Sequence, residues 1–111
     1  MAVMPMNNDF KIIIERIQKN FTRRPRTKYW LQVVNDTYDR TYNFFINIQP
    51  QSKRMHSIPL HTVENYNLLY LEQLIDRISK QFHLTISYDG FTGIKWPVKQ
   101  ELIQKRRHID E

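Results

Sequence analysis

The stretch TYNFFINI, residues 41–48, has the clearest strand pattern in the sequence, and the neighbouring segments are interpreted outward from it. Its four even-numbered residues are large and apolar, whereas Asn43 and Asn47 are polar. An alternation of period two predicts a β-strand with one buried face and one face toward solvent. Phe45 is the exception, an aromatic side chain on the polar face, and it is therefore a candidate contact residue.

A similar strand precedes this one. Residues 28–35, KYWLQVVN, are rich in β-branched and aromatic side chains, and residues 35–40, NDTYDR, are of the types that form turns. The two strands therefore predict an antiparallel hairpin. Residues 49–61 are compatible either with a short third strand around 54–58 or with a loop, because two prolines limit any strand there.

Helices are predicted on both sides of the hairpin. Apolar residues recur at steps of three and four in residues 8–21 and again in residues 62–82, which is the spacing of an amphipathic helix. Residues 84–88 alternate as a further strand, and the chain's two glycines follow it in a turn. Pro97 is suited to the first position of a short C-terminal helix over residues 98–107.

The order of these elements, α-β-β-(β)-α-β-α, predicts an α+β fold. We expect a two-layer single domain in which the helices pack on a small antiparallel or mixed sheet of three or four strands. A chain of 111 residues fits one such domain. Residues 7–111 are assigned to it, and residues 1–6 are expected to be disordered.

The composition argues against an enzyme. The chain has no cysteine, which excludes disulfides and thiolate metal sites, and its two glycines cannot build a phosphate-binding loop. None of the four histidines has the spacing of a metal-binding pair, and a chance pairing is the simpler interpretation of His56 and His61. We therefore expect no catalytic residues, no metal and no cofactor.

The sequence also bears on location and source. It contains no run of about 18 apolar residues, and its N-terminus lacks the basic and apolar regions of a signal peptide. We therefore expect a cytoplasmic protein that does not contact a membrane. Glycine and alanine are scarce whereas isoleucine and asparagine are frequent, which indicates a low-GC genome such as that of a bacterium, a phage or another mobile element.

The net charge of +6 favours a polyanionic partner. The excess is greatest in residues 21–30, FTRRPRTKYW, where four cations lie around a proline. Two interpretations are open, because arginines can grip phosphates or can complement the negative C-terminal end of the preceding helix. The candidate binding cations are Arg23, Arg24, Arg26, Lys28, Lys53, Arg54, Lys105, Arg106 and Arg107.

Aromatic side chains are candidate contacts beside these cations. They are Trp30, Phe45 and Trp96. Aromatic rings stack on unpaired bases and anchor protein interfaces. For Trp30 the strand alternation offers a structural alternative, namely a place in the core.

Two functions are compatible with these features. The first is a non-enzymatic module that binds nucleic acid or a nucleoprotein complex. The second is a protein-interaction module, such as a small inhibitor or adaptor, that binds an acidic protein surface; a homodimer through an open sheet edge is a further arrangement. The second predicted helix begins near HTVENYN, residues 61–67, without the basic cluster of double-stranded-RNA-binding domains, and the RNP motifs of RRM domains are absent.

Overall fold

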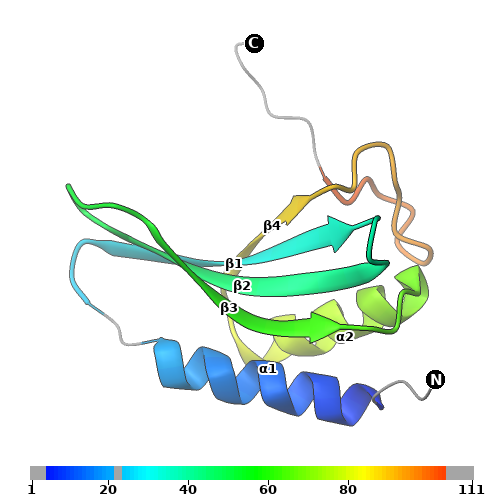
Figure 1. The fold of residues 1–111 in the computed structure, drawn as a ribbon, viewed down its shortest axis with the longest axis horizontal. Coiled ribbons are helices and arrows are strands. Elements are labelled where there is room, and N and C mark those ends of the chain that lie inside the picture. The colour runs from blue at the N-terminus through cyan, green and yellow to red at the C-terminus, as the bar shows by residue number, and fades with distance from the viewer. Residues whose placement is uncertain (1–4, 22–23, 105–111) are drawn as a thin grey trace.

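Four strands form one mixed sheet in the order β3-β2-β1-β4 (Figure 1). The computed structural model describes residues 5–21 and 24–104. Along the chain the elements are α1 (Met6–Asn20), β1 (Thr27–Asp36), β2 (Thr41–Pro50), β3 (His56–Val63), α2 (Leu68–Gln81) and β4 (Thr85–Asp89). The pairs β1–β2 and β2–β3 are antiparallel, whereas β4 is parallel to β1. The predicted α+β class is confirmed.

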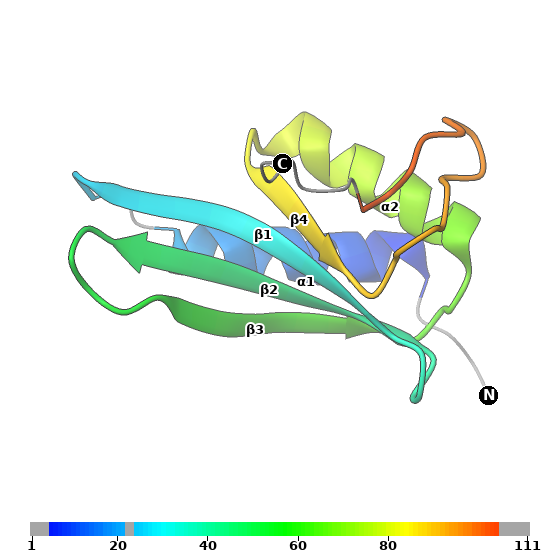
Figure 2. The ribbon, with the colours of Figure 1, turned by 90° about the horizontal axis from the view of Figure 1, so that it is seen from above.

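The two helices lie on the same face of the sheet. Figure 2 looks onto the opposite face, with both helices behind it, and no other element of the described residues covers that face. α1 packs against β3, β2 and α2. The buried side chains Tyr42, Phe44 and Ile46 of β2 confirm the alternation from which the strand was predicted. We call the side of the sheet without helices the open face.

The hydrophobic core fills the space between the sheet and the helices. All six elements except β4 contribute fully buried side chains, and the loop after β4 contributes more. The core residues are Ile13, Ile14, Ile17, Leu31, Val33, Tyr42, Phe44, Ile46, Leu60, Val63, Leu71, Leu74, Ile75, Ile78, Phe91, Trp96 and Ile103. The apolar stripe predicted for the first helix is thereby confirmed at its centre.

The third strand is longer than predicted. β3 continues through Pro59 to Val63, so the second helix begins at Leu68 and not near residue 62. β3 is an edge strand, and its pairing with β2 shifts register opposite Phe44 and Phe45. Edge strands and bulges are the places where a sheet tolerates a residue without an N–H group, which explains why the proline does not end the strand.

The predicted C-terminal helix is wrong for residues 98–104, which form turns. A bridge between Lys95 and Leu102 closes this segment as a small hairpin. Gln100 at its tip has a positive φ of 59° and donates its N–H to the carbonyl of Trp96 at 3.0 Å. A left-handed residue at this position reverses the chain and prevents a continuous helix.

A buried carboxylate holds this C-terminal hairpin against α2. Glu72 is only 5% exposed, and its two oxygens accept the N–H groups of Val98 at 2.9 Å and of Lys99 at 3.0 Å. The spacing of apolar residues after Pro97 could not show this contact, because it comes from a distant element. Glu72 provides acceptors for two backbone N–H groups of the turn and so fixes the turn against α2.

Candidate functional site

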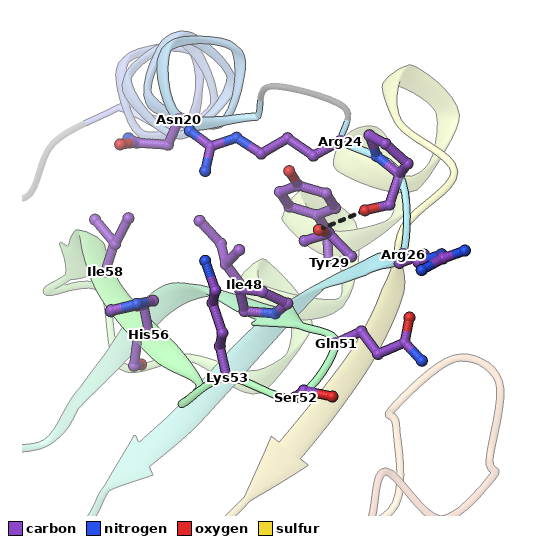
Figure 3. A pocket seen from close by; sticks show the side chains of 14 residues that line it. Asn20, Arg24, Arg26, Tyr29, Ile48, Gln51, Ser52, Lys53, His56 and Ile58 are labelled. Atoms are coloured by element: carbon purple, nitrogen blue, oxygen red, sulfur yellow. Dashed lines mark hydrogen bonds between the residues drawn. The ribbon is translucent and has the colours of Figure 1, made fainter.

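The sheet extends beyond the end of α1 (Figure 1). A hollow opens there (Figure 3). The paired residues Thr27 and Pro50 mark this end of β1 and β2, and α1 ends at Asn20. The hollow has a volume of about 870 Å³. Its lining consists of Asn20, Arg24, Pro25, Arg26, Thr27, Tyr29, Ile48, Pro50, Gln51, Ser52, Lys53, His56, Ser57 and Ile58.

Cations from two distant segments meet at this hollow. Arg24 and Arg26 come from the loop before β1, and Lys53 comes from the turn after β2. The carbonyl of Arg26 accepts the N–H of Gln51 at 2.8 Å, which holds the loop and the turn side by side. Figure 3 shows Arg24 and Lys53 extending into the hollow, whereas Arg26 points away from it. None of the described lining residues carries a carboxylate.

The floor of the hollow is apolar. Tyr29, Ile48 and Ile58 are half-buried there, on the same side of the sheet as the helices. Phe21 packs edge-on against Tyr29, with 4.7 Å between the ring centroids. His56 lies exposed beside them. A ligand in this hollow would therefore meet cations at the rim and apolar surface below.

Two residues of the rim have an unusual backbone. Arg26 and Ser52 have positive φ angles of 57° and 62°, although neither is a glycine. The left-handed conformation costs an ordinary residue about 1–2 kcal/mol. Such conformations persist only where surrounding contacts fix them, and they cluster at functional sites. The rim thus has a defined shape, which the hydrogen bond between Arg26 and Gln51 helps to maintain.

The other predicted cations are placed differently. Lys28 pairs with Gln49 on the open face, on the other side of the sheet from the hollow, and Arg54 is exposed in the turn after β2. Arg24 extends toward Asn20 in Figure 3, so its position fits both the helix-end interpretation and the ligand-binding interpretation. Four further candidates lie outside the described residues: Arg23, Lys105, Arg106 and Arg107.

The structure separates the three candidate aromatic residues. Trp30 and Phe45 are half-buried side chains of the open face, as their positions in β1 and β2 require. Trp96, in contrast, is 7% exposed and packs edge-on against Tyr88 in the core, with 5.6 Å between the ring centroids. Trp96 is therefore not available as a surface contact, because its ring fills the space under the C-terminal hairpin.

A row of hydrogen-bonded side chains crosses the open face, and the sequence analysis missed it. Ser57 donates to Asn47 at 2.7 Å, Asn47 donates to Gln32 at 3.0 Å, and Gln32 donates to Asp89 at 2.5 Å. The row thus joins β3, β2, β1 and β4. The centre of this row could have been predicted from the pairing register of the hairpin. That register places Asn47 opposite Trp30 and therefore on the same face as Gln32.

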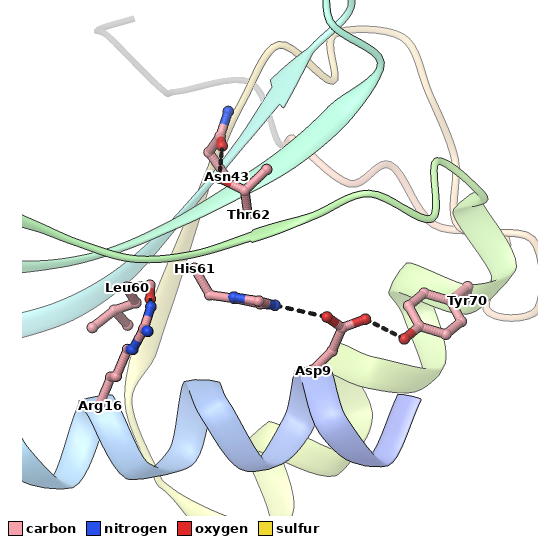
Figure 4. A network of polar contacts seen from close by, with 7 residues as sticks. All are labelled: Asp9, Arg16, Asn43, Leu60, His61, Thr62 and Tyr70. Atoms are coloured by element: carbon pink, nitrogen blue, oxygen red, sulfur yellow. Dashed lines mark hydrogen bonds and ion pairs between the residues drawn. The ribbon is translucent and has the colours of Figure 1, made fainter. Parts of the chain in front are cut away.

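A second polar cluster joins three elements on the helix side (Figure 4). Asp9 of α1 is 2% exposed and lies 2.7 Å from Nε2 of His61 in β3. The hydroxyl group of Tyr70 in α2 donates a hydrogen bond to the other carboxylate oxygen of Asp9. Burial, followed by this hydrogen bond, raises the pKa of Tyr70 well above its usual value. His61 therefore has a structural role in this cluster. The described residues contain no group of three or more potential metal ligands.

No helix among the described residues is long and apolar enough to cross a membrane. No family model matches the chain, and neither the curated proteins nor the solved structures provide a significant match.

Proposed function

We propose that this chain is a non-enzymatic module that binds nucleic acid through its basic end, which we define as Arg24, Arg26, Lys28, Lys53 and Arg54. The observation that carries the proposal is the meeting of cations from two distant segments around a hollow whose described lining has no carboxylate. Uncompensated positive charge at one end of a domain attracts polyanions, and release of their counterions drives binding.

The surroundings of these cations support the same conclusion. The ion pairs found in the described residues are His61–Asp9 and Lys80–Asp76, and neither lies at the basic end. A guanidinium group can hold a phosphate through two parallel hydrogen bonds, and an ammonium group can act as a point charge beside it. Arg24 and Lys53 extend into one hollow and are therefore suited to bind one phosphate backbone together (Figure 3).

The test is fluorescence anisotropy with labelled single-stranded and duplex oligonucleotides between about 50 and 200 mM salt. We expect the affinity to fall steeply as salt rises. The double variant Arg24→Ala/Lys53→Ala removes two phosphate contacts and should reduce the slope of log affinity against log salt by about 1.4–1.8.

A charge-matched control is available in the C-terminal hairpin. Lys95 and Lys99 are exposed and do not line the hollow, so Lys95→Ala/Lys99→Ala should leave affinity and slope nearly unchanged. If the two double variants weakened binding equally, binding would depend on the net charge of the protein and not on the position of these cations. Absence of salt-dependent binding by the unaltered protein would rule out the proposed function.

A further inference from the structure

Four side chains form a regular block at the centre of the open face. Trp30 lies directly opposite Asn47, and Gln32 lies directly opposite Phe45. The two amides occupy one diagonal of this block and are joined by a hydrogen bond of 3.0 Å. The two aromatic rings occupy the other diagonal. Diagonal neighbours on a sheet are about 7–8 Å apart, so the rings flank the bonded amides.

The two aromatic residues of this block are partly exposed. Asn47 is only 3% exposed, whereas Trp30 and Phe45 keep part of their surface in solvent. No element of the described chain packs on the open face (Figure 2). The hydrogen bonds from Gln32 to Asp89 and from Asn47 to Gln32 fix the amides, and the row therefore gives the rings a rigid support.

The charge around the block is one-sided. Lys28, which belongs to the basic end, lies on the same face two residues before Trp30. The block itself is neutral, and Asp89 lies on its other side, opposite Val34. A ligand that is anionic at one place and flat and neutral beside it would match this arrangement.

We propose that the open face binds single-stranded nucleic acid, with unpaired bases stacked on Trp30 and Phe45 and the phosphates directed toward Lys28 and the basic end. The inference rests on the proposed function and adds the class of nucleic acid to it. Bases of a duplex are paired and stacked on one another and cannot lie on these rings, whereas every unpaired base offers a flat surface.

The polar part of the block adds hydrogen-bonding capacity. The side-chain amide of Gln32 carries two N–H groups, of which the bond to Asp89 uses one. The second N–H group can donate to the edge of a base that lies on a neighbouring ring. Stacking is tolerant of sequence, so a preference among bases would come from this amide.

The test compares a thymidylate oligonucleotide of about twelve nucleotides with a duplex of the same length at low salt. Trp30→Ala should weaken binding of the single strand about tenfold, and Phe45→Ala should have a similar effect, because base–aromatic stacking is lost. Binding of the duplex should change less than twofold. Tyr38→Ala is the control, since Tyr38 is 94% exposed in the turn after β1 and lies outside the block.

A second measurement reports contact directly and does not depend on removal of a face residue. The chain has two tryptophans, so in the Trp96→Phe variant Trp30 is the sole source of tryptophan fluorescence. Stacking of a base should quench this emission when the single strand is added, and the duplex should not.

The outcomes separate the inference from the function on which it rests. Salt-dependent binding that is equal for single strand and duplex, without an effect of Trp30→Ala and without quenching, would overturn the inference alone. Absence of salt-dependent binding to either oligonucleotide would overturn both the inference and the proposed function, and a protein would then be the expected partner of the open face. Tighter binding of the single strand, lost in both face variants but not in Tyr38→Ala, is the expected result.

Discussion

Asp9 is the residue at which α1, β3 and α2 are joined. Its carboxylate is almost completely buried. One oxygen is hydrogen-bonded to Nε2 of His61, and the other accepts a hydrogen bond from the hydroxyl group of Tyr70. Asp9→Asn removes the negative charge that both hydrogen bonds are made to and replaces one acceptor oxygen by an N–H₂ group, which weakens both bonds. We expect the free energy of unfolding to fall by about 1–3 kcal/mol, measured by urea denaturation.

The matched control for this change is Asp76→Asn. Asp76 is also a helical carboxylate, but its ion pair with Lys80, at 3.1 Å, is exposed to solvent. Exposed pairs of this kind contribute less than about 0.5 kcal/mol. Similar losses of stability in the two variants would contradict the role assigned to Asp9.

Two tyrosines, the buried Tyr42 and the partly buried Tyr88, predict how stability depends on alkaline pH. Burial raises the pKa of Tyr42 and of Tyr88 from 10.0 to about 12. Both groups therefore stabilise the folded state fully below pH 10, and this contribution is lost as the pH rises from 10 through 12, because the unfolded chain ionises first. Urea denaturation at pH 8, 10 and 11 should show the decline. The Tyr42→Phe/Tyr88→Phe variant should show a shallower decline, and an equal one would contradict this cause.

The positive φ angle of Arg26 predicts opposite effects on stability and binding. Arg26→Gly removes a cation of the basic end but relieves the left-handed backbone. We expect a gain of about 0.5–1 kcal/mol in stability and a weaker affinity for oligonucleotides. Arg40 has the same φ of 57° in the turn between β1 and β2, so Arg40→Gly is a matched control. Its affinity should not change, and equal weakening in both variants would indicate an effect of net charge alone.

At the level of the elements, the buried carboxylate of Glu72 adds to the apolar packing that docks the C-terminal hairpin. Glu72→Gln replaces an acceptor for the N–H groups of Val98 and Lys99 by a donor, which should release the hairpin and cost about 1–3 kcal/mol. In a Trp30→Phe background, the emission of Trp96 should shift to longer wavelength as water reaches its ring.

A control for this element is the exposed Glu64. Glu64→Gln should leave both the emission of Trp96 and the stability unchanged. An unshifted emission in Glu72→Gln would show that apolar packing against Tyr88 suffices to hold the hairpin.

Elements with a strong internal period could be predicted, and those shaped by distant contacts could not. The alternation in residues 41–48 correctly indicated β2 because that strand is central and has one buried face. β3 was uncertain because a proline has a different meaning on an edge strand than inside a sheet. The helix expected at 98–107 failed over its described part because Gln100 has a left-handed backbone and Lys95 pairs with Leu102, which the spacing of apolar residues does not show.

At the scale of the whole molecule, the edges of the sheet predict the oligomeric state. β3 has Pro59 and a register shift at its edge, and the other edge strand, β4, has five residues. Both features disfavour pairing with another sheet. We expect sedimentation of the free protein to give the mass of one chain, and a concentration-dependent dimer that survives high salt would contradict this expectation.

The basic end and the open face could be predicted only in part. Arg24, Arg26 and Lys53 were chosen as candidates from their charge alone, and alternation placed Phe45 on the solvent side. Their neighbours were not foreseen, since the hollow depends on where α1 ends relative to the sheet.

Periodicity and composition are properties that can be followed along the chain, and they were sufficient to predict the α+β class, the buried face of β2 and the excess of positive charge. Which cations lie together could be learned only from the folded chain, because a backbone hydrogen bond between Arg26 and Gln51 joins two segments that are distant in the sequence. The tertiary structure also decided that Trp96 is buried while Trp30 remains on a surface. The physical reason is that the pairing of strands and the packing of helices on one face, not the nature of a side chain, set what surrounds it.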